Sequence, residues 1–485
     1  MGDLHSFVDL PPPESSDSKF IETFHEDEKG PISPLNSADL HTNDFLDWKT
    51  FEPSKEETIV EPEPTVEPEP TLNEMPPNHF SELPPSDSSD LPPSDSPNLK
   101  LVQPTEEEWI AQSTSNSASW RGALSVEAYL RREAVLAKTP FTEDGGMTIW
   151  ALVDKEDAGR QVLAGCETTK KKAIISRNGR IEDVLCHGIG SVWCPPEKRK
   201  RGYAGRMMKE LGVALGKWQG EEKEVPFTVL FSDIGKDFYA RHGWEPFNSS
   251  HISVPASSEL VEGPIDLNRL PHTTPILASD LADLCATDED LIRKSMTSAG
   301  SQSKTLVAIV PTAEQIHWHH AREDFVANEL YGKTPEIKGA VVGTEKGKRV
   351  WCYWTRMFYN EDPTQSKGNT LHILRLVVEQ KEMFRGEKAG AAQEGVEFVP
   401  AIAALFIAAR EQAREWHMEE VEAWNPSTAT IRAAQLVWPQ AKVVHRDKES
   451  VTSLKWHGEP LPGMQEGQKV GEFVDWIANE KYGWC

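Results

Sequence analysis

The first hundred residues most constrain what this 485-residue chain can fold into. They hold 23 of the chain's 77 acidic residues, 5 of its 51 basic residues and 17 of its 35 prolines, with repeated Glu-Pro and Pro-Pro-Ser-Asp runs. A segment of this composition cannot bury enough apolar surface to offset the entropy of ordering it. We therefore predict a disordered, acidic and proline-rich tail over residues 1–98, with the folded part after it.

The folded remainder has a nearly balanced charge, with 54 acidic and 46 basic residues after residue 100. Neutralising nucleic-acid phosphates needs a basic excess on at least one face, and no apolar run reaches the ~20 residues of a membrane span. The six cysteines lack paired CxxC spacing, which argues against a disulfide framework or a zinc site. We expect no nucleic-acid, membrane or metal partner and a reducing, cytoplasmic setting; the partner of the tail stays open.

The first folded segment is predicted to be a mixed sheet covered by helices. Thr105 to Glu108 has the form of a capping box that begins a helix, and Asn178-Gly179 between two β-rich runs predicts a type I′ hairpin. Further helices are predicted at residues 126–136, 204–218 and 235–242, and strands at 148–153, 161–176, 182–194 and 225–233. This order indicates an α/β (α+β) fold.

The second half repeats this order. Helices are predicted at residues 277–296, 313–330, 398–416 and 428–437, and strands at 338–344, 349–359, 370–378 and 421–424. The sequence thus predicts a domain at 99–251 followed by a related domain at 252–485.

A basic loop between a predicted strand and a helix is suited to a phosphate ligand. Residues 195–205 read PPEKRKRGYAG, and glycine at a helix N-terminus lets a pyrophosphate approach the unpaired backbone N–H groups. Arg206 adds a further positive charge. Taken alone, the same loop is equally compatible with a solvated basic surface.

Two motifs together are more specific. Residues 199–204 read RKRGYA, of the form R-x-x-G-x-A, and residues 238–244 read FYARHGW, of the form F-Y-x-x-x-G-W. In this order, with a helix and a strand between them, they resemble the coenzyme A loop and a later segment of GNAT acetyltransferases. Over residues 124–247 the chain also resembles the fungal lysine N-acetyltransferases of lysine utilisation.

The resemblance implies that acetyl-coenzyme A is the co-substrate and that an amine attacks its thioester directly in a ternary complex. It implies that Val192 and Cys194 offer backbone groups to the pantetheine arm. The residues implied to bind the pyrophosphate are Arg199, Lys200, Arg201, Gly202, Tyr203, Ala204 and Gly205.

Three residues are candidates for acid–base catalysis. Tyr239, protonated at neutral pH, is predicted to donate a proton to the leaving thiolate, although a Phe-Tyr pair on a helix is more commonly core packing. Glu167 and His187 are candidate bases, acting directly or through water; the alternatives are a solvated strand glutamate and a hydrogen-bonded core histidine. Nothing beside Cys194 lowers its pKa, so we interpret it as strand packing and not as a nucleophile.

Two further segments are predicted to bind nothing. The run from His317 to His320 lies in a helix without a matched acidic partner, which favours a surface helix face over a metal site. The strand-to-helix loop of the second domain, residues 380–396, has no R-x-x-G-x-A, so we expect a degenerate GNAT-like domain without cofactor.

Three functions follow as hypotheses. The favoured one is acetylation of the side-chain amine of free L-lysine, a lysine N6-acetyltransferase of lysine degradation. The others are a GNAT acetyltransferase for a protein lysine or another small amine, and a non-catalytic GNAT scaffold.

Overall fold

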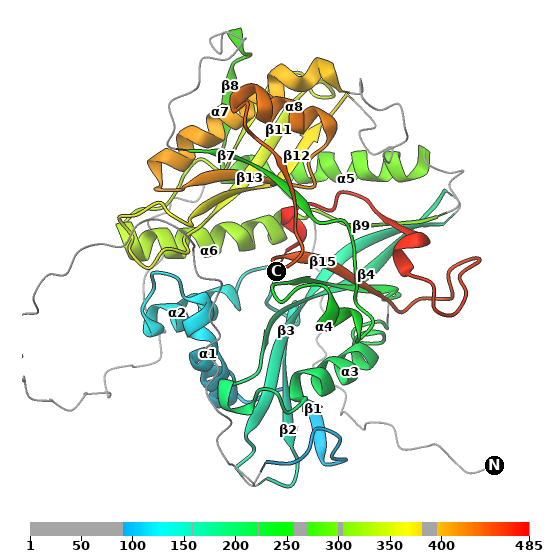
Figure 1. The fold of residues 1–485 in the computed structure, drawn as a ribbon. Coiled ribbons are helices and arrows are strands. Elements are labelled where there is room, and N and C mark those ends of the chain that lie inside the picture. Colours follow the sequence, from blue (N-terminus) through cyan, green and yellow to red (C-terminus); the bar gives the residue numbers. More distant parts are fainter. Residues whose placement is uncertain are drawn as a thin grey trace, which may run out of the picture. The chain divides into compact units, whose positions relative to one another are not determined.

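The computed structural model describes residues 91–484 except for 158, 178, 222, 257–268, 299–303 and 381–394. These residues form two sheets with helices on their faces (Figure 1). The predicted mixed fold, with a GNAT-like sheet followed by a second GNAT-like module, is confirmed. Residues 1–90 and Asn178 lie outside the described residues.

The first sheet has the strand order β1-β2-β3-β4-β5-β15-β6, with β9 beside β3 and β16 beside β9. Its strands are β1 (Leu99–Val102), β2 (Met147–Asp154), β3 (Val162–Arg177), β4 (Arg180–Trp193), β5 (Phe227–Ser232), β6 (Glu245–Pro246), β9 (Thr305–Ile309), β15 (Val451–Trp456) and β16 (Val474–Trp476). β3 and β4 form an antiparallel hairpin with Arg177 opposite Arg180, and β4 and β5 are parallel. The hairpin is long enough that β3 pairs with β2 near its start and with β9 near its end.

The second sheet has the order β14-β7-β13-β12-β11-β10-β8. Its strands are β7 (Ser250–Pro255), β8 (Thr273–Ile276), β10 (Gly339–Val342), β11 (Val350–Met357), β12 (Thr370–Val378), β13 (Glu420–Trp424) and β14 (Val443–His445). β12 and β13 are its parallel pair; counted from β8, they hold the fourth and fifth places, as β4 and β5 do in the first sheet counted from β1. The two sheets therefore share one plan.

The two halves of the chain exchange a strand. β7, from the end of the first half, pairs with β13 of the second sheet, whereas β15, from the end of the second half, pairs with β5 of the first sheet. Counted from β1 in the first sheet and from β8 in the second, each exchanged strand occupies the sixth place of its new sheet. The predicted domain boundary between residues 251 and 252 falls inside β7. The sequence gives no sign of the exchange, because the composition does not change where the strand passes from one module to the other.

The helices begin close to where the sequence predicts them. They are α1 (Glu106–Trp120), α2 (Val126–Leu136), α3 (Tyr203–Leu215), α4 (Asp237–Ala240), α5 (Leu281–Ser298), α6 (Ala313–Tyr331), α7 (Val399–Glu415) and α8 (Thr428–Val437), with 3-10 turns η1 (Pro196–Lys198), η3 (Ala278–Asp280), η5 (Val396–Phe398), η6 (Val470–Glu472) and η7 (Lys481–Gly483). The capping box at Thr105 and Glu108 is present, and Ser125 caps α2. Local hydrogen bonds of this kind fix helix starts.

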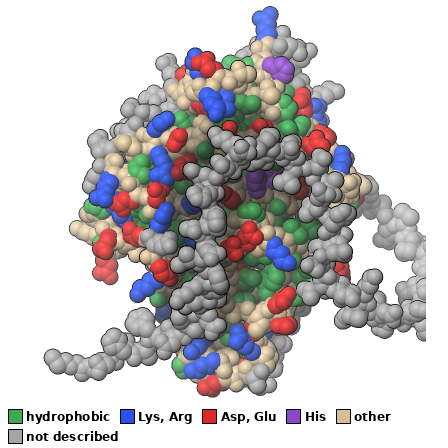
Figure 2. All heavy atoms as spheres, turned by 180° about the vertical axis from the view of Figure 1, so that it is seen from behind, with side chains coloured by type: hydrophobic (Ala, Val, Ile, Leu, Met, Phe, Trp, Pro, Cys, Tyr) green, Lys and Arg blue, Asp and Glu red, His purple; other side chains and the backbone are tan. Residues whose placement is uncertain are grey.

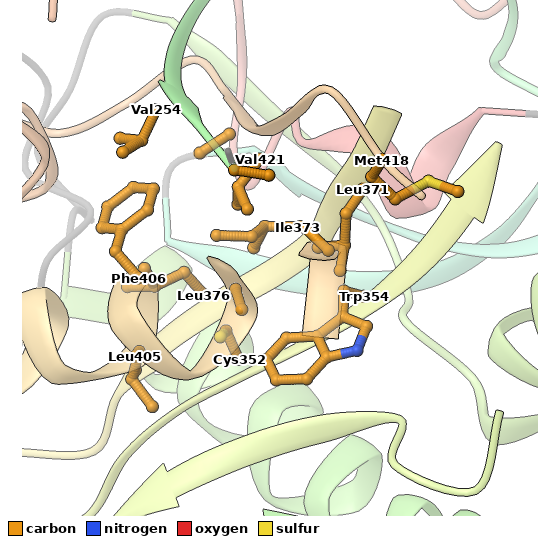
Figure 3. Close-up of a cluster of buried hydrophobic side chains, with 14 of the residues drawn as sticks. Val254, Cys352, Trp354, Leu371, Ile373, Leu376, Leu405, Phe406, Met418 and Val421 are labelled. Carbon is orange, nitrogen blue, oxygen red and sulfur yellow. The ribbon is translucent and has the colours of Figure 1, made fainter. Parts of the chain in front are cut away.

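Hydrophobic side chains join the sheets and helices. In Figure 3, Leu405 and Phe406 of α7 pack with side chains of the second sheet; the labelled residues are Val254, Cys352, Trp354, Leu371, Ile373, Leu376, Leu405, Phe406, Met418 and Val421. Another cluster contains Val229 of the first sheet, Leu374 of the second, and residues of α5 and α6. The two modules therefore share buried surface within one folded unit.

Candidate active site

The predicted phosphate-binding loop joins β4 to α3 through two residues with left-handed backbone. Lys200 has a φ of 62° and Gly202 a φ of 89°, a conformation that favours glycine. Gly202 is the N-cap of the 13-residue helix α3 and contributes no side-chain hydrogen bond. Gly202 therefore leaves the first N–H groups of α3 without a side-chain cap of its own, which suits an approaching anion.

Basic side chains are held around this helix start. Lys198, Arg199 and Arg206 each donate to a backbone carbonyl, at 2.8, 3.0 and 3.0 Å, and Lys200 is exposed at the tip. Their charges add to the positive end of the α3 dipole, which favours a polyanion at this position. This geometry suits a pyrophosphate, and the pyrophosphate site stays a prediction.

Residues 91–98 lie against this loop. Tyr203 Oη donates to the carbonyl of Pro92 at 2.5 Å, and Arg206 donates to the carbonyl of Ser94. A Cβ added to Gly202 would lie 2.6 Å from Ser94 Oγ. The predicted tail of residues 1–98 thus extends too far, because its last eight residues satisfy hydrogen-bond donors of α3.

β4 and β5 part from each other next to the loop. Their parallel pairing ends at Ile189 and Leu230, whereas β4 continues for four more residues. Along the same stretch the register between β3 and β4 shifts, and Ser191 has a φ of 51°, as expected of a β-bulge. Val192, and Cys194 just beyond the strand, are therefore not paired with β5, and their role in binding the pantetheine arm stays a prediction.

Glu167 lies on β3 at this bulge, opposite Gly190. Ser191 Oγ donates to its carboxylate at 2.8 Å. The pKa of Glu167 is raised to about 7, first by burial and then by the carboxylate of Glu133 on α2, against the lowering effects of Ser191 and Arg132. A carboxylate that ionises near neutral pH is well matched to accept a proton from an amine.

His187, the other predicted base, lies in the sheet interior. Its Nε2 is 3.0 Å from the carbonyl of Trp218, which assigns the proton to Nε2, and burial lowers its pKa to about 4. A neutral ring bonded to a carbonyl is typical of a core histidine. The structure places Glu167, and not His187, at the bulge just beyond the end of the β4–β5 pairing.

Tyr239 lies on α4 with its ring edge against Phe238, 5.0 Å between centroids. Burial raises the pKa of Tyr239, and Cys166 on β3 and Asp233 after β5 raise it further, so the phenol is protonated. These neighbours belong to the strands that border the opening. The position is compatible with proton donation to a leaving thiolate, and the acid role stays a prediction.

Cys194 fits a packing role. Its Sγ donates to the carbonyl of Leu163 at 3.4 Å. Burial raises its pKa to about 11, more than the nearby Arg199 and Lys198 lower it. Such a thiol is not an activated nucleophile at neutral pH.

The histidines of α6 do not form the predicted surface face. His317 is exposed, but His319 and His320 are buried, with their Nε2 atoms at 3.1 Å from the carbonyl of Tyr482 and 2.9 Å from that of Trp354. The prediction was wrong because the covering residues come from distant strands and from the end of the chain. Among the described residues, no group of three or more His, Cys, Asp or Glu side chains is placed to hold a metal ion.

Acidic and basic side chains are interspersed over the face of the molecule seen in Figure 2. A cavity of 630 Å³ lies beside the middle of the β3–β4 hairpin, lined by residues such as Lys170, Lys172 and Leu185, and it includes none of the predicted site residues. In the part of the chain that the structure describes, no helix is both long enough and apolar enough to cross a membrane.

Known proteins share this architecture. Residues 251–485 match the family model described as the LYC1 GNAT-like C-terminal domain. A lysine acetyltransferase of Yarrowia lipolytica is 26% identical over 426 residues, which cover 80% of this chain and 100% of that protein. An uncharacterised protein of Saccharomyces cerevisiae is 24% identical over 249 residues, covering 44% of this chain and 61% of that relative.

Solved structures of similar fold include a GCN5-related N-acetyltransferase from Kribbella flavida, with a TM-score of 0.43, 18% identity and coverage of 74% of this chain and 71% of that chain. The Saccharomyces cerevisiae N-myristoyltransferase with bound myristoyl-CoA has a TM-score of 0.42 and 10% identity, covering 75% and 81%. The chain resembles the GNAT-superfamily lysine acetyltransferases. The co-substrate of GNAT acetyltransferases is acetyl-coenzyme A or another acyl-coenzyme A.

Sequence reasoning missed several polar residues near the site. Arg132 and Glu133 of α2 form an ion pair of 2.6 Å and act electrostatically on Glu167. Near the end of the chain, Lys481 is buried and acts on Asp233. Of these residues, only Arg132 and Glu133 could have been noticed in the sequence, because they are charged residues within an otherwise apolar stripe of a predicted helix.

The loop of the second module, residues 380–396, lies mostly outside the described residues. Gly395 is described, has a φ of 77° and precedes η5 and α7, as Gly202 precedes α3. The expectation that this module binds no cofactor stays a prediction.

Proposed function

We propose that the chain transfers an acetyl group from acetyl-coenzyme A to the side-chain amine of free L-lysine. The observation that carries this proposal is Glu167, whose pKa is raised to about 7 at the bulge where β4 leaves β5, beside the basic loop that begins α3. We infer that Glu167 activates the amine and that the basic loop binds the coenzyme, because both lie next to the end of the β4–β5 pairing. The Yarrowia lipolytica relative is named lysine acetyltransferase, which supports a lysine amine as the acceptor.

The proposed reaction has three proton transfers. Glu167 accepts a proton from the acceptor ammonium, and the neutral nitrogen attacks the thioester carbonyl. The N–C bond forms as the C–S bond breaks, and the departing thiolate takes a proton from Tyr239. The nitrogen then gives up its second proton, which restores the Tyr239 phenol, so that the net product proton is the one on Glu167. The basic loop binds the pyrophosphate throughout and fixes the coenzyme, so that attack is effectively intramolecular.

A base is required at this step. A lysine ε-amine has a reference pKa of ~10.4, so only about one part in 10³ is neutral at pH 7. Generating the free amine there costs ~4 to 5 kcal/mol. A carboxylate with a pKa near 7, in a partly buried setting, can offset part of this cost.

A small acceptor is favoured over a folded protein. The second module contributes β15 to the first sheet and shares a core with it, so the opening has neighbours on both sides. Clefts between such modules commonly bind small ligands. Acetylation of a protein lysine, or of another small amine, is the alternative that uses the same base.

The test is turnover of acetyl-coenzyme A by the full chain with free lysine, ornithine, cadaverine and a lysine-containing peptide. We expect kcat/KM for lysine to exceed that for ornithine by at least roughly tenfold, since a misplaced methylene is worth ~1 to 3 kcal/mol. Preference for the peptide would replace the lysine assignment by the protein alternative. Absence of turnover with every amine would favour the non-catalytic scaffold.

A further inference from the structure

Two buried cations lie on one tryptophan beside the end of β5. Trp424 ends β13, and its ring is 5.8 Å from that of Phe231 on β5. The guanidinium of Arg446 lies 3.9 Å from the centroid of a ring of Trp424, and Lys481 Nζ lies 4.4 Å from it. Lys481 Nζ is also 4.2 Å from a ring of Trp484. We refer to Arg446 and Lys481 as the Trp424 cation pair.

Neither cation is balanced by direct contact with a carboxylate. Lys481 is 2% exposed and Arg446 is 7% exposed. Arg446 Nη1 donates to the carbonyl of Ser250 at 3.0 Å, but its Nε and Nη2 have no hydrogen-bond partner. Within the described ranges, neither residue forms an ion pair. Removing charges from water without a counter-ion is costly, so this arrangement favours an anionic ligand.

Glu422 on β13, a carboxylate that interacts electrostatically with both cations, already has other partners. Trp424 Nε1 donates to it at 2.6 Å, and His372 Nδ1 and His251 Nε2 lie 3.2 and 3.5 Å from its oxygens. Burial raises the pKa of Glu422, but the two histidines and Trp424 outweigh burial and hold the pKa well below its usual range. Glu422 thus stays ionised without contacting the cation pair.

The pair lies next to the end of β5. Phe231, whose ring is 5.8 Å from that of Trp424, directly follows Leu230, the last β5 residue paired with β4. Arg322 of α6 interacts electrostatically with Lys481 and with Tyr129 of α2. The cation pair therefore lies beside the strand end at which the acetyl transfer is proposed.

We propose that Arg446 and Lys481 bind the carboxylate of the acetyl acceptor and so select an α-amino acid whose side-chain amine reaches Glu167. This inference rests on the proposed acetyl transfer. The two free donors of Arg446 match the two oxygens of a carboxylate, and Lys481 adds a second charge from the other segment. Burial lowers the pKa of Lys481 to about 7, and an arriving carboxylate favours its protonated form. An acceptor without a carboxylate would leave both cations unpaired.

The experiment compares lysine with cadaverine, which has the same carbon chain and terminal amines but no carboxylate. In the Lys481→Met chain we expect the KM for lysine to rise about 10- to 100-fold, the scale of one lost charge-assisted hydrogen bond. The kcat for lysine and the kcat/KM for cadaverine should change little. Arg446→Gln should give the same pattern, which provides an independent variant if one substitution impairs folding.

Lys333→Met is the matched control. Lys333 also lies over a tryptophan, 4.6 Å from a ring of Trp416, but it is exposed. We expect unchanged kinetics with both amines. A variant of the cation pair that loses lysine and cadaverine turnover equally, or that keeps the wild-type KM for lysine, would overturn the carboxylate assignment alone. A wild-type chain that fails to acetylate lysine would instead overturn the proposed function.

Discussion

Replacing Glu167 by glutamine removes the proposed base while keeping its shape. Ser191 Oγ, which donates to Glu167 at 2.8 Å, can donate equally to the glutamine carbonyl oxygen, so the bulge should persist. General bases contribute about 10²- to 10⁴-fold to rate. We expect kcat/KM for the acceptor to fall within that range, equivalent to ~3 to 5 kcal/mol of transition-state stabilisation.

The pH profile gives the sharper test. With cadaverine as the acceptor, for which Lys481 is not needed, kcat/KM should fall about tenfold per pH unit below the Glu167 pKa of about 7 and level off above it, because Glu167 accepts a proton only when ionised. Glu133 raises the pKa of Glu167, hence Glu133→Gln should move this inflection to lower pH while leaving the plateau nearly unchanged. Glu167→Gln should have no such inflection.

The assay is steady-state release of coenzyme A over about pH 5.5 to 8.5, with acetyl-coenzyme A saturating and the acceptor below its KM, so that free-enzyme pKa values are reported. Far-UV circular dichroism at each pH shows whether the variants stay folded. A Glu167→Gln chain with near-wild-type kcat/KM and an unchanged acid limb would remove Glu167 from the mechanism. An inflection that does not move in Glu133→Gln would refute the electrostatic argument for the raised pKa.

Three further predictions concern the loop, the acid and the N-terminal segment. Gly202→Ala should raise the KM for acetyl-coenzyme A at least roughly tenfold, because an alanine at positive φ costs ~1 to 2 kcal/mol and its Cβ would collide with Ser94. Gly332→Ala is the control: its φ is also positive, at 67°, but nothing lies within 4 Å of the added Cβ, and the KM should not change. Tyr239→Phe should lower kcat by roughly 10²-fold with little change in coenzyme affinity, and a wild-type kcat would return this residue to a packing role. Deleting residues 1–90 should leave thermal melting and turnover unchanged, whereas deleting 1–97 should lower the melting temperature by about 1 to 4 °C, because α3 loses carbonyl partners; equal melting of the two chains would contradict this.

The parts of the fold that depend on neighbouring residues were predictable. The capping residues Thr105 and Ser125 and the hairpin turn before Arg180 are fixed by side chains or backbone preferences within a few positions. The loop at Gly202 was found for the same reason, since its glycine, its basic residues and the following helix are contiguous in sequence. Local chemistry therefore predicted the module plan and a loop suited to the coenzyme, whose binding residues stay a prediction.

The parts that depend on distant partners were missed. No strand was predicted at β7, β9 or β15, because each pairs with a strand far away in the sequence and has no hairpin turn to its partner. His319 was expected at the surface and is buried, because Tyr482 covers it from the end of the chain. Burial of a polar residue by a remote segment leaves no periodic pattern around it.

The strand exchange explains why the acceptor side, in particular, could not be derived from the sequence. β5 ends the parallel pair that opens beside the coenzyme loop, and its other edge is completed by β15 from the second half. β13 holds Trp424 in the second sheet and is completed by β7 from the first half. Neither half alone therefore has both a complete sheet and the cation pair. The proposed base lies on β3 of the first sheet and the proposed carboxylate-binding pair lies on Trp424 of the second, so we expect acceptor selection to require both modules.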